Sequence, residues 1–185
     1  IPGVIGYKLR YYYYKIFCKK IGKNVLIDVG VILNGSANIS LDDYTWVEPY
    51  CVINAMLGEI QIGKRVHIGP FVNIGSREPV IIEDYVAIGA SSKIYSNSQT
   101  IISGKRMGGS MIPEEDKAFY TAPVYLRKDC FIGVNTVILP GVEVCEGAVV
   151  GANSVVTKSV TAWTIVSGVP AKKLMDRKKL KIKDY

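Results

Sequence analysis

The chain of 185 residues has one histidine, four cysteines and no long apolar run. A single histidine cannot readily supply the several imidazole ligands of a metal site shared between subunits, and the cysteines are not spaced as metal ligands. We therefore expect no metal cofactor. Scattered cysteines also argue against a disulfide framework, so we expect reduced, small, buried thiols of a cytoplasmic protein.

Apolar runs of roughly 18 residues, the length that a membrane-spanning helix needs, are absent, so we expect no transmembrane helix. We also see no signal peptide. The net charge is +7, and much of it lies near the two ends of the chain. No motif that reads nucleic acid accompanies this charge, so we expect no nucleic-acid partner. Part of it suits a polyanionic cofactor, and the rest suits solubility or an anionic surface.

What the sequence has in abundance is a repeat of six residues between 126 and 161. An aliphatic residue opens each block, a glycine often follows, and the fifth residue is small or valine. Neither a helix nor simple strand alternation has this period, whereas a chain that turns three times per circuit does. Three blocks close one triangular coil, which stacks Leu126 beneath Val144, Ile132 beneath Val150 and Ile138 beneath Val156. Gly133 and Gly151 are expected at corners.

The same phase recurs in stronger form at 62–95 and in weaker form at 21–54. Hexapeptide repeats of this kind are typical of parallel β-helices, so we predict an all-β fold of about six triangular coils over residues 21–161.

Residues 1–20 are predicted to form an amphipathic helix, because Tyr7, Tyr11, Tyr14 and Cys18 recur at helical spacing with basic residues between them. Two interpretations stay open. The helix packs on the base of the coils and covers the first strand edge, or it associates weakly with a membrane surface and makes the protein peripheral to the inner face of the membrane.

Two other segments depart from the repeat. Residues 96–125 are polar and glycine-rich, and we predict a long loop inserted between two coils, since loops of this length in compact domains are usually functional. Residues 162–171 are expected to close the coils, and the basic tail 172–185 is expected to be helical. Together, residues 162–185 are expected to form a C-terminal closing segment and basic tail.

The hexads, the 96–125 loop, Val155-Val156-Thr157-Lys158 and the ending Gly168-Val169-Pro170-Ala171-Lys172 together resemble the hexapeptide-repeat acyltransferases. Within that family the chain is similar to the maltose, galactoside and lipopolysaccharide O-acetyltransferases. The resemblance implies a left-handed parallel β-helix, a homotrimer with active sites between adjacent subunits, acetyl-CoA as the donor, and a sugar or nucleotide-sugar acceptor.

An attacking sugar hydroxyl must lose a proton, so a general base assists the transfer. In maltose-type relatives the base lies at a position that Gln99 occupies here, and an amide cannot act as a base. A set of polysaccharide-locus relatives carries motifs similar to Val66-His67-Ile68, Tyr95-Ser96-Asn97-Ser98 and Met111-Ile112-Pro113-Glu114-Glu115. The resemblance therefore favours His67, expected at an exposed corner, as the base. An ordinary surface histidine is the alternative.

The resemblance also implies binding residues. Asn97, Ser98 and Gln99 are candidates for orienting the sugar. The pantetheine arm of CoA is expected to run along a groove between neighbouring subunits and the phosphates to meet lysines. The expected cofactor residues are Gly133, Ala152, Thr157, Lys158, Lys172 and Lys173.

The leading hypothesis is an acetyl-CoA-dependent O-acetyltransferase of surface polysaccharide or lipopolysaccharide synthesis, with direct attack on the thioester. Two alternatives remain. One is N-acetylation of a nucleotide-linked amino sugar, because a neutral amine attacks without a strong base. The other is a non-catalytic trimeric scaffold.

Overall fold

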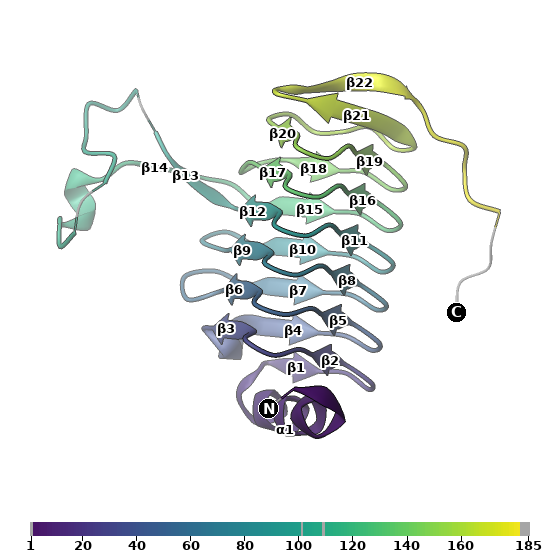
Figure 1. Ribbon diagram of the computed structural model, residues 1–185. Helices are drawn as coiled ribbons and strands as arrows, with labels where there is room; N and C mark the ends of the chain where they lie inside the picture. Colours follow the sequence, from purple (N-terminus) through teal and green to yellow (C-terminus); the bar gives the residue numbers. More distant parts are fainter. Residues whose placement is uncertain (1, 101, 109, 182–185) are drawn as a thin grey trace.

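The computed structural model describes residues 2–100, 102–108 and 110–181. They form a left-handed parallel β-helix with three flat walls, closed below by a helix and above by a hairpin (Figure 1). In the described chain there are six complete coils and part of a seventh, as the repeat predicts.

Each wall is a sheet to which every coil contributes one short strand. Sheet A contains β1 (Lys20–Ile21), β4 (Ile39–Leu41), β7 (Ile60–Ile62), β10 (Val80–Ile82), β15 (Val124–Leu126) and β18 (Glu143–Val144). Sheet B contains β2 (Leu26–Ile27), β5 (Trp46–Val47), β8 (His67–Ile68), β11 (Ala87–Ile88), β16 (Phe131–Ile132), β19 (Val149–Val150), β21 (Thr164–Gly168) and β22 (Ala171–Asp176). Sheet C contains β3 (Ile32–Asn34), β6 (Val52–Asn54), β9 (Asn73–Gly75), β12 (Lys93–Tyr95), β17 (Val137–Ile138) and β20 (Val155–Val156).

The predicted stacking of the aliphatic residues is confirmed. Leu126 pairs with Val144, Ile132 with Val150 and Ile138 with Val156, and all six side chains are buried. The fifth residue of each hexad is also buried, because it points inward where the wall turns. Its members are Cys130, Thr136, Val142, Ala148, Ser154 and Val160.

The corners owe their shape to two kinds of residue. Left-handed φ angles fall on larger residues such as Tyr44 (61°), Arg65 (55°) and Tyr85 (61°), which stack at the corner between sheets A and B. Gly133 is at a corner for a steric reason. A Cβ there would lie 2.5 Å from the backbone nitrogen of Ala152 in the next coil. Glycine is required at this position by close approach of the backbones.

Helix α1 (Gly3–Phe17) lies across the base of the prism (Figure 1). The Tyr7 hydroxyl donates to Asp28 Oδ2 at 2.6 Å, and the Tyr14 hydroxyl donates to the carbonyl of Val31 at 3.0 Å. Arg10 Nε donates to the carbonyl of Ile27 at 2.6 Å. These bonds join the helix to the first coil, so the capping interpretation is confirmed. Among the described residues, no helix is long and apolar enough to span a membrane.

The inserted segment forms an arm that leaves the corner between sheets C and A (Figure 1). The predicted loop contains elements that the sequence does not reveal. Strands β13 (Asn97–Gln99) and β14 (Phe119–Thr121) pair antiparallel at its root, and a turn of 3-10 helix, η2 (Glu114–Asp116), lies further out. A second such turn, η1 (Ser36–Asn38), lies at the same corner in the first coil.

The prediction of a helical tail is wrong for residues 172–181, because none of them is helical. Residues 171–176 form β22, which pairs antiparallel with β21. The last strand of a stacked sheet leaves its backbone groups unpaired, and a returning strand satisfies them where a helix would not. Residues 182–185 of the predicted helix lie outside the described residues.

Candidate functional site

His67 lies on the flat outer face of sheet B, in β8, and not at the corner where the sequence predicted it. Its neighbour Ile68 is fully buried, and successive strand residues point to opposite faces. The imidazole must therefore point outward. Its side chain is 47% exposed.

Two residues from the coil below hold the imidazole of His67. Glu48 Oε1 lies 2.9 Å from His67 Nε2, and the Trp46 ring stacks on the imidazole with centroids 5.0 Å apart and planes at 26°. When Nε2 carries the proton toward the carboxylate, Nδ1 becomes the free acceptor. The pair therefore has the arrangement of a base oriented by a carboxylate. Neither Glu48 nor Trp46 was predicted as a site residue.

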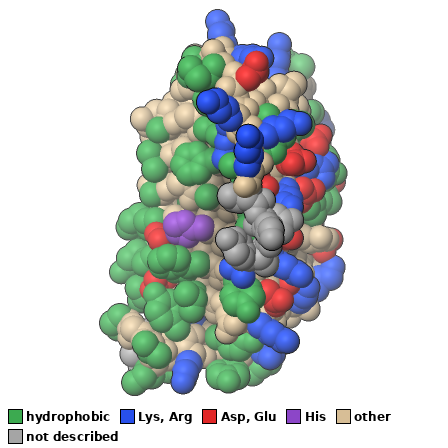
Figure 2. All heavy atoms as spheres, turned by 90° about the vertical axis from the view of Figure 1, so that its right-hand side faces the viewer, with side chains coloured by type: hydrophobic (Ala, Val, Ile, Leu, Met, Phe, Trp, Pro, Cys, Tyr) green, Lys and Arg blue, Asp and Glu red, His purple; other side chains and the backbone are tan. Residues whose placement is uncertain are grey.

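The outward residues that stack above and below His67 on this face are apolar. One outward residue from each coil continues a single ladder along sheet B, and His67 is its only polar member (Figure 2). The other members are Leu26, Trp46, Ala87, Phe131, Val149 and Ile165.

The predicted sugar-binding residues lie away from His67. Asn97, Ser98 and Gln99 form β13 at the root of the arm, which leaves the prism on the side opposite sheet B (Figure 1). The structure therefore does not bring the predicted base and the predicted sugar contacts together within one chain.

A hollow of about 420 Å³ lies beside the root of the arm, on the outer face of sheet C. Asn73, Tyr95 and Asn97 line it together with Arg77. A Cβ at Gly75 would lie 2.5 Å from the Tyr95 ring, so glycine gives this ring its place against the sheet. An aromatic face and amide groups suit a polar ring, and the Arg77 guanidinium beside them already lies 3.6 Å from Glu114 Oε2 and over the Phe119 ring. Asn97 is the predicted sugar residue that lines this hollow.

The predicted cofactor residues divide into three groups. Gly133 and Ala152 stack at the corner between sheets B and C. Thr157 and Lys158 are exposed after β20, at the corner between sheets C and A. Lys172 and Lys173 pair with Ser167 and Val166 in the closing hairpin. Lys173 Nζ also lies 2.7 Å from Asp176 Oδ1, so part of its charge is already neutralised.

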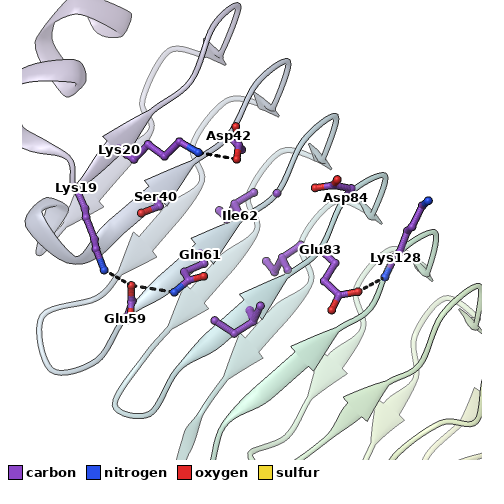
Figure 3. A pocket seen from close by; sticks show the side chains of 13 residues that line it. Lys19, Lys20, Ser40, Asp42, Glu59, Gln61, Ile62, Glu83, Asp84 and Lys128 are labelled. Atoms are coloured by element: carbon purple, nitrogen blue, oxygen red, sulfur yellow. Dashed lines mark hydrogen bonds and ion pairs between the residues drawn. The ribbon is translucent and has the colours of Figure 1, made fainter. Parts of the chain in front are cut away.

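A second hollow, of about 500 Å³, lies on sheet A and contains none of the predicted site residues (Figure 3). Its charged groups bind one another: Lys20 Nζ lies 2.7 Å from Asp42 Oδ2, and Glu59 bonds both Lys19 and Gln61. The Lys20 ammonium holds the pKa of Asp42 below its usual value. These pairs satisfy the carboxylates internally, which leaves little charge there for a ligand.

The thiols are poor nucleophiles. Burial raises the pKa of Cys51 to about 11 and that of Cys130 to about 12. Burial also raises the pKa of Cys18 to about 11. A thiolate is the reactive form, so none of these three is suited to carry an acyl group at neutral pH.

Known proteins share this fold and about a third of the sequence over most of the chain. A family model for the hexapeptide repeat of succinyl-transferase matches residues 124–158. The chain is 34% identical over 161 residues to a dTDP-4-amino-4,6-dideoxy-D-glucose acyltransferase of Escherichia coli, covering 87% of this chain and 83% of the relative. It is 28% identical over 153 residues to the galactoside O-acetyltransferase of Escherichia coli strain K12, covering 79% of this chain and 70% of the relative.

A solved structure gives the same result. The crystal structure of AntD, an N-acyltransferase from Bacillus cereus in complex with dTDP and 3-hydroxybutyryl-CoA, matches with a TM-score of 0.84 at 29% identity, covering 91% of this chain and 88% of that chain. With the coils, the repeat and this similarity over most of its length, the chain belongs to the hexapeptide-repeat acyltransferases.

Proposed function

We propose that the protein transfers an acyl group from acyl-CoA to the amino group of a nucleotide-linked amino sugar. The observation that carries this proposal is the similarity, over most of the chain, to two acyltransferases whose names specify a dTDP amino sugar or a complex with dTDP and an acyl-CoA. On this support we favour N-acylation, the alternative from the sequence analysis, over O-acetylation, which was the leading hypothesis there.

The reaction forms an amide and breaks a thioester. The neutral amine attacks the thioester carbonyl, the C–S bond breaks, the nitrogen loses a proton and the CoA thiolate takes one up. His67 Nδ1 is the proposed acceptor of the amine proton, with Glu48 holding the other ring nitrogen. Direct attack agrees with the raised pKa of the buried thiols, which leaves no good internal nucleophile among them.

We place the acyl donor along the corner between sheets B and C, where Gly133 and Ala152 bring two backbones close together. Exposed Lys172 in the closing hairpin is the proposed cation for its phosphates, and Lys158, at the other edge of sheet C, is a second one for a donor that extends across that sheet. We place the acceptor in the hollow lined by Tyr95 and Asn97.

The site is completed only by a second copy of the chain in this proposal. His67 and the arm lie on opposite sides of one prism, so the arm of one subunit must reach the sheet B face of another (Figure 1). The apolar ladder around His67 supports this, because contact between subunits would bury it. A homotrimer closes such a head-to-tail contact into a ring.

O-acetylation of a sugar is the second candidate, and the Glu48–His67 pair favours it. A hydroxyl needs a base more than an amine does, and an oriented imidazole supplies one.

The decisive experiment incubates the protein with acetyl-CoA or 3-hydroxybutyryl-CoA and three acceptors. These are a dTDP-linked 4-amino sugar, the matching 4-hydroxy sugar, and a free amino sugar. Amide formation only on the nucleotide-linked amine supports the proposal. Ester formation on the hydroxy sugar would replace it with the second candidate. A chain that neither turns over nor shows a thermal shift with CoA would be the scaffold.

A further inference from the structure

Helix α1 has a second apolar face that the coils do not cover. One face of the helix is hydrogen-bonded to the first coil through Tyr7, Arg10, Tyr11 and Tyr14. On the opposite face, apolar residues recur at helical spacing from Ile5 to Phe17, and they are exposed. These residues and their exposed fractions are Ile5 69%, Leu9 57%, Tyr12 64%, Tyr13 58%, Ile16 78% and Phe17 50%.

This face is held rigidly. The hydrogen bonds from α1 to the first coil reach partners at Gly22, Ile27, Asp28 and Val31, so they fix the helix at several points along its length. A surface helix normally buries its one apolar stripe and leaves polar residues outside. Here the outer stripe is apolar as well, which marks a surface for interaction.

The sequence of the first 27 residues carries charge of a single sign, although Lys19 and Lys20 at its end pair with Glu59 and Asp42 of later coils. The first 27 residues contain no aspartate or glutamate, while the first acidic residue is Asp28. The basic residues in that segment are Lys8, Arg10, Lys15, Lys19, Lys20 and Lys23. Lys8 and Lys23 line a groove of about 590 Å³ beside the helix, together with Tyr7, Tyr11 and Tyr12. The base of the molecule thus combines hydrophobic and basic side chains (Figure 2), and tyrosines are among the hydrophobic ones.

These features select one occupant. A second copy of α1 would bring like charges together. This disfavours a contact between the α1 ends of two molecules. A membrane with anionic headgroups complements both features, because tyrosines suit the headgroup boundary, aliphatic side chains enter the acyl region and lysines meet the phosphates. We propose that the outer face of α1 docks the protein on an anionic membrane surface.

The binding should be reversible and sensitive to salt, because a single interfacial helix anchors only weakly. The purified full chain would be sedimented with vesicles of phosphatidylcholine, with and without phosphatidylglycerol. We expect binding to the anionic vesicles alone, and its loss at about 0.5 M salt. The double variant Leu9→Asp with Ile16→Asp should weaken binding at least about tenfold, since it removes apolar contact and adds two negative charges.

The matched control is Ile102→Asp, an exposed isoleucine in the arm, which is 90% exposed. It should bind vesicles as the unchanged chain does. Circular dichroism and thermal unfolding would confirm that the double variant folds. Three outcomes would overturn the proposal: no vesicle binding by the unchanged chain, equal binding by the double variant, or a double variant whose mass in solution falls, which would show that this face joins copies of the chain.

Discussion

Glu48 Oε1 lies 2.9 Å from His67 Nε2, across two adjacent coils of sheet B. The two residues are 19 apart in sequence, about one coil, so the stacking of the walls brings them together. The Trp46 ring supports the imidazole from the same lower coil. The structure thus supplies His67 with an orienting carboxylate and an aromatic platform.

Changing this pair should separate the two candidate reactions. We expect His67→Ala to lower kcat about 100-fold or more if the acceptor is a hydroxyl, because alcohol attack needs the base. With an amine acceptor the loss should be much smaller. Glu48→Gln should lower kcat in the same direction while leaving KM for acyl-CoA unchanged. Steady-state kinetics of both variants on both acceptors provide the measurement, with Glu146→Gln, an exposed glutamate elsewhere, as the control. If that control loses as much activity as Glu48→Gln, the pairing has no catalytic meaning.

Two adjacent lysines should differ in their contribution to binding acyl-CoA. Lys173 is paired with Asp176 at 2.7 Å, whereas Lys172 has no such ion pair with any of the residues that the structure describes. We expect Lys172→Ala to raise KM for acyl-CoA about fivefold to tenfold, consistent with loss of one charged contact to a phosphate. Lys173→Ala should raise it less. The difference should shrink as ionic strength rises. Equal KM values for both variants and the unchanged chain would remove these lysines from the donor site.

The hexad predicts the walls of this protein well and its site only in part. The register of Leu126 on Val144 follows from the period, because every aliphatic residue must enter the same narrow core. The Glu48–His67 contact does not, since the lower coils contain extra residues at their corners, which shifts the spacing between stacked outer residues. Aligning the coils by their buried residues, Val47 on Ile68, would have revealed it.

The tail shows a different limit. Residues 171–176 are rich in lysine and favour a helix locally, but β21 offers a row of unpaired backbone groups that only a strand can satisfy. That demand arises from the tertiary structure and is absent from the local sequence. The same is true of His67: the buried Ile68 beside it makes it a wall residue, although the hexad boundary suggested a corner.

Tyr95 tests the proposed place of the acceptor. Its ring lies over Gly75 in the hollow beside the arm. We expect Tyr95→Ala to raise KM for the nucleotide-linked acceptor about tenfold, through loss of one ring contact, and to leave KM for acyl-CoA unchanged. Gly75→Ala should act in the same direction, because its new methyl group displaces the ring. Tyr44→Ala, at a distant corner, is the control for loss of an exposed tyrosine. A rise in KM for acyl-CoA with Tyr95→Ala would put the donor, and not the acceptor, in this hollow.

The buried thiols predict how stability depends on pH. Burial raises the pKa of Cys130 to about 12 and that of Cys51 to about 11, while an unfolded thiol has its ordinary pKa near 9. Above pH 9 the unfolded chain therefore binds fewer protons than the folded chain, and the free energy of unfolding falls as pH rises. Each buried thiol makes its full contribution to the free energy of unfolding below pH 9. This contribution is lost as the pH rises toward the pKa of the thiol in the folded protein.

Thermal or urea unfolding between pH 7 and 10.5 would measure this slope. We expect each buried thiol to remove roughly 1 kcal/mol of unfolding free energy per pH unit above pH 9. Cys130→Ala should therefore be less stable at neutral pH, owing to the cavity, yet have a flatter decline in alkali. Val142→Ala is the matched control, because Val142 is buried at the equivalent position of another hexad and does not titrate. Val142→Ala should lower the free energy of unfolding by a similar amount, because it also leaves a cavity. Its free energy of unfolding should fall with pH as steeply as that of the unchanged chain. If the two variants decline in parallel, protons bound by Cys130 do not stabilise the fold, and the alkaline loss must come from the tyrosines and lysines instead.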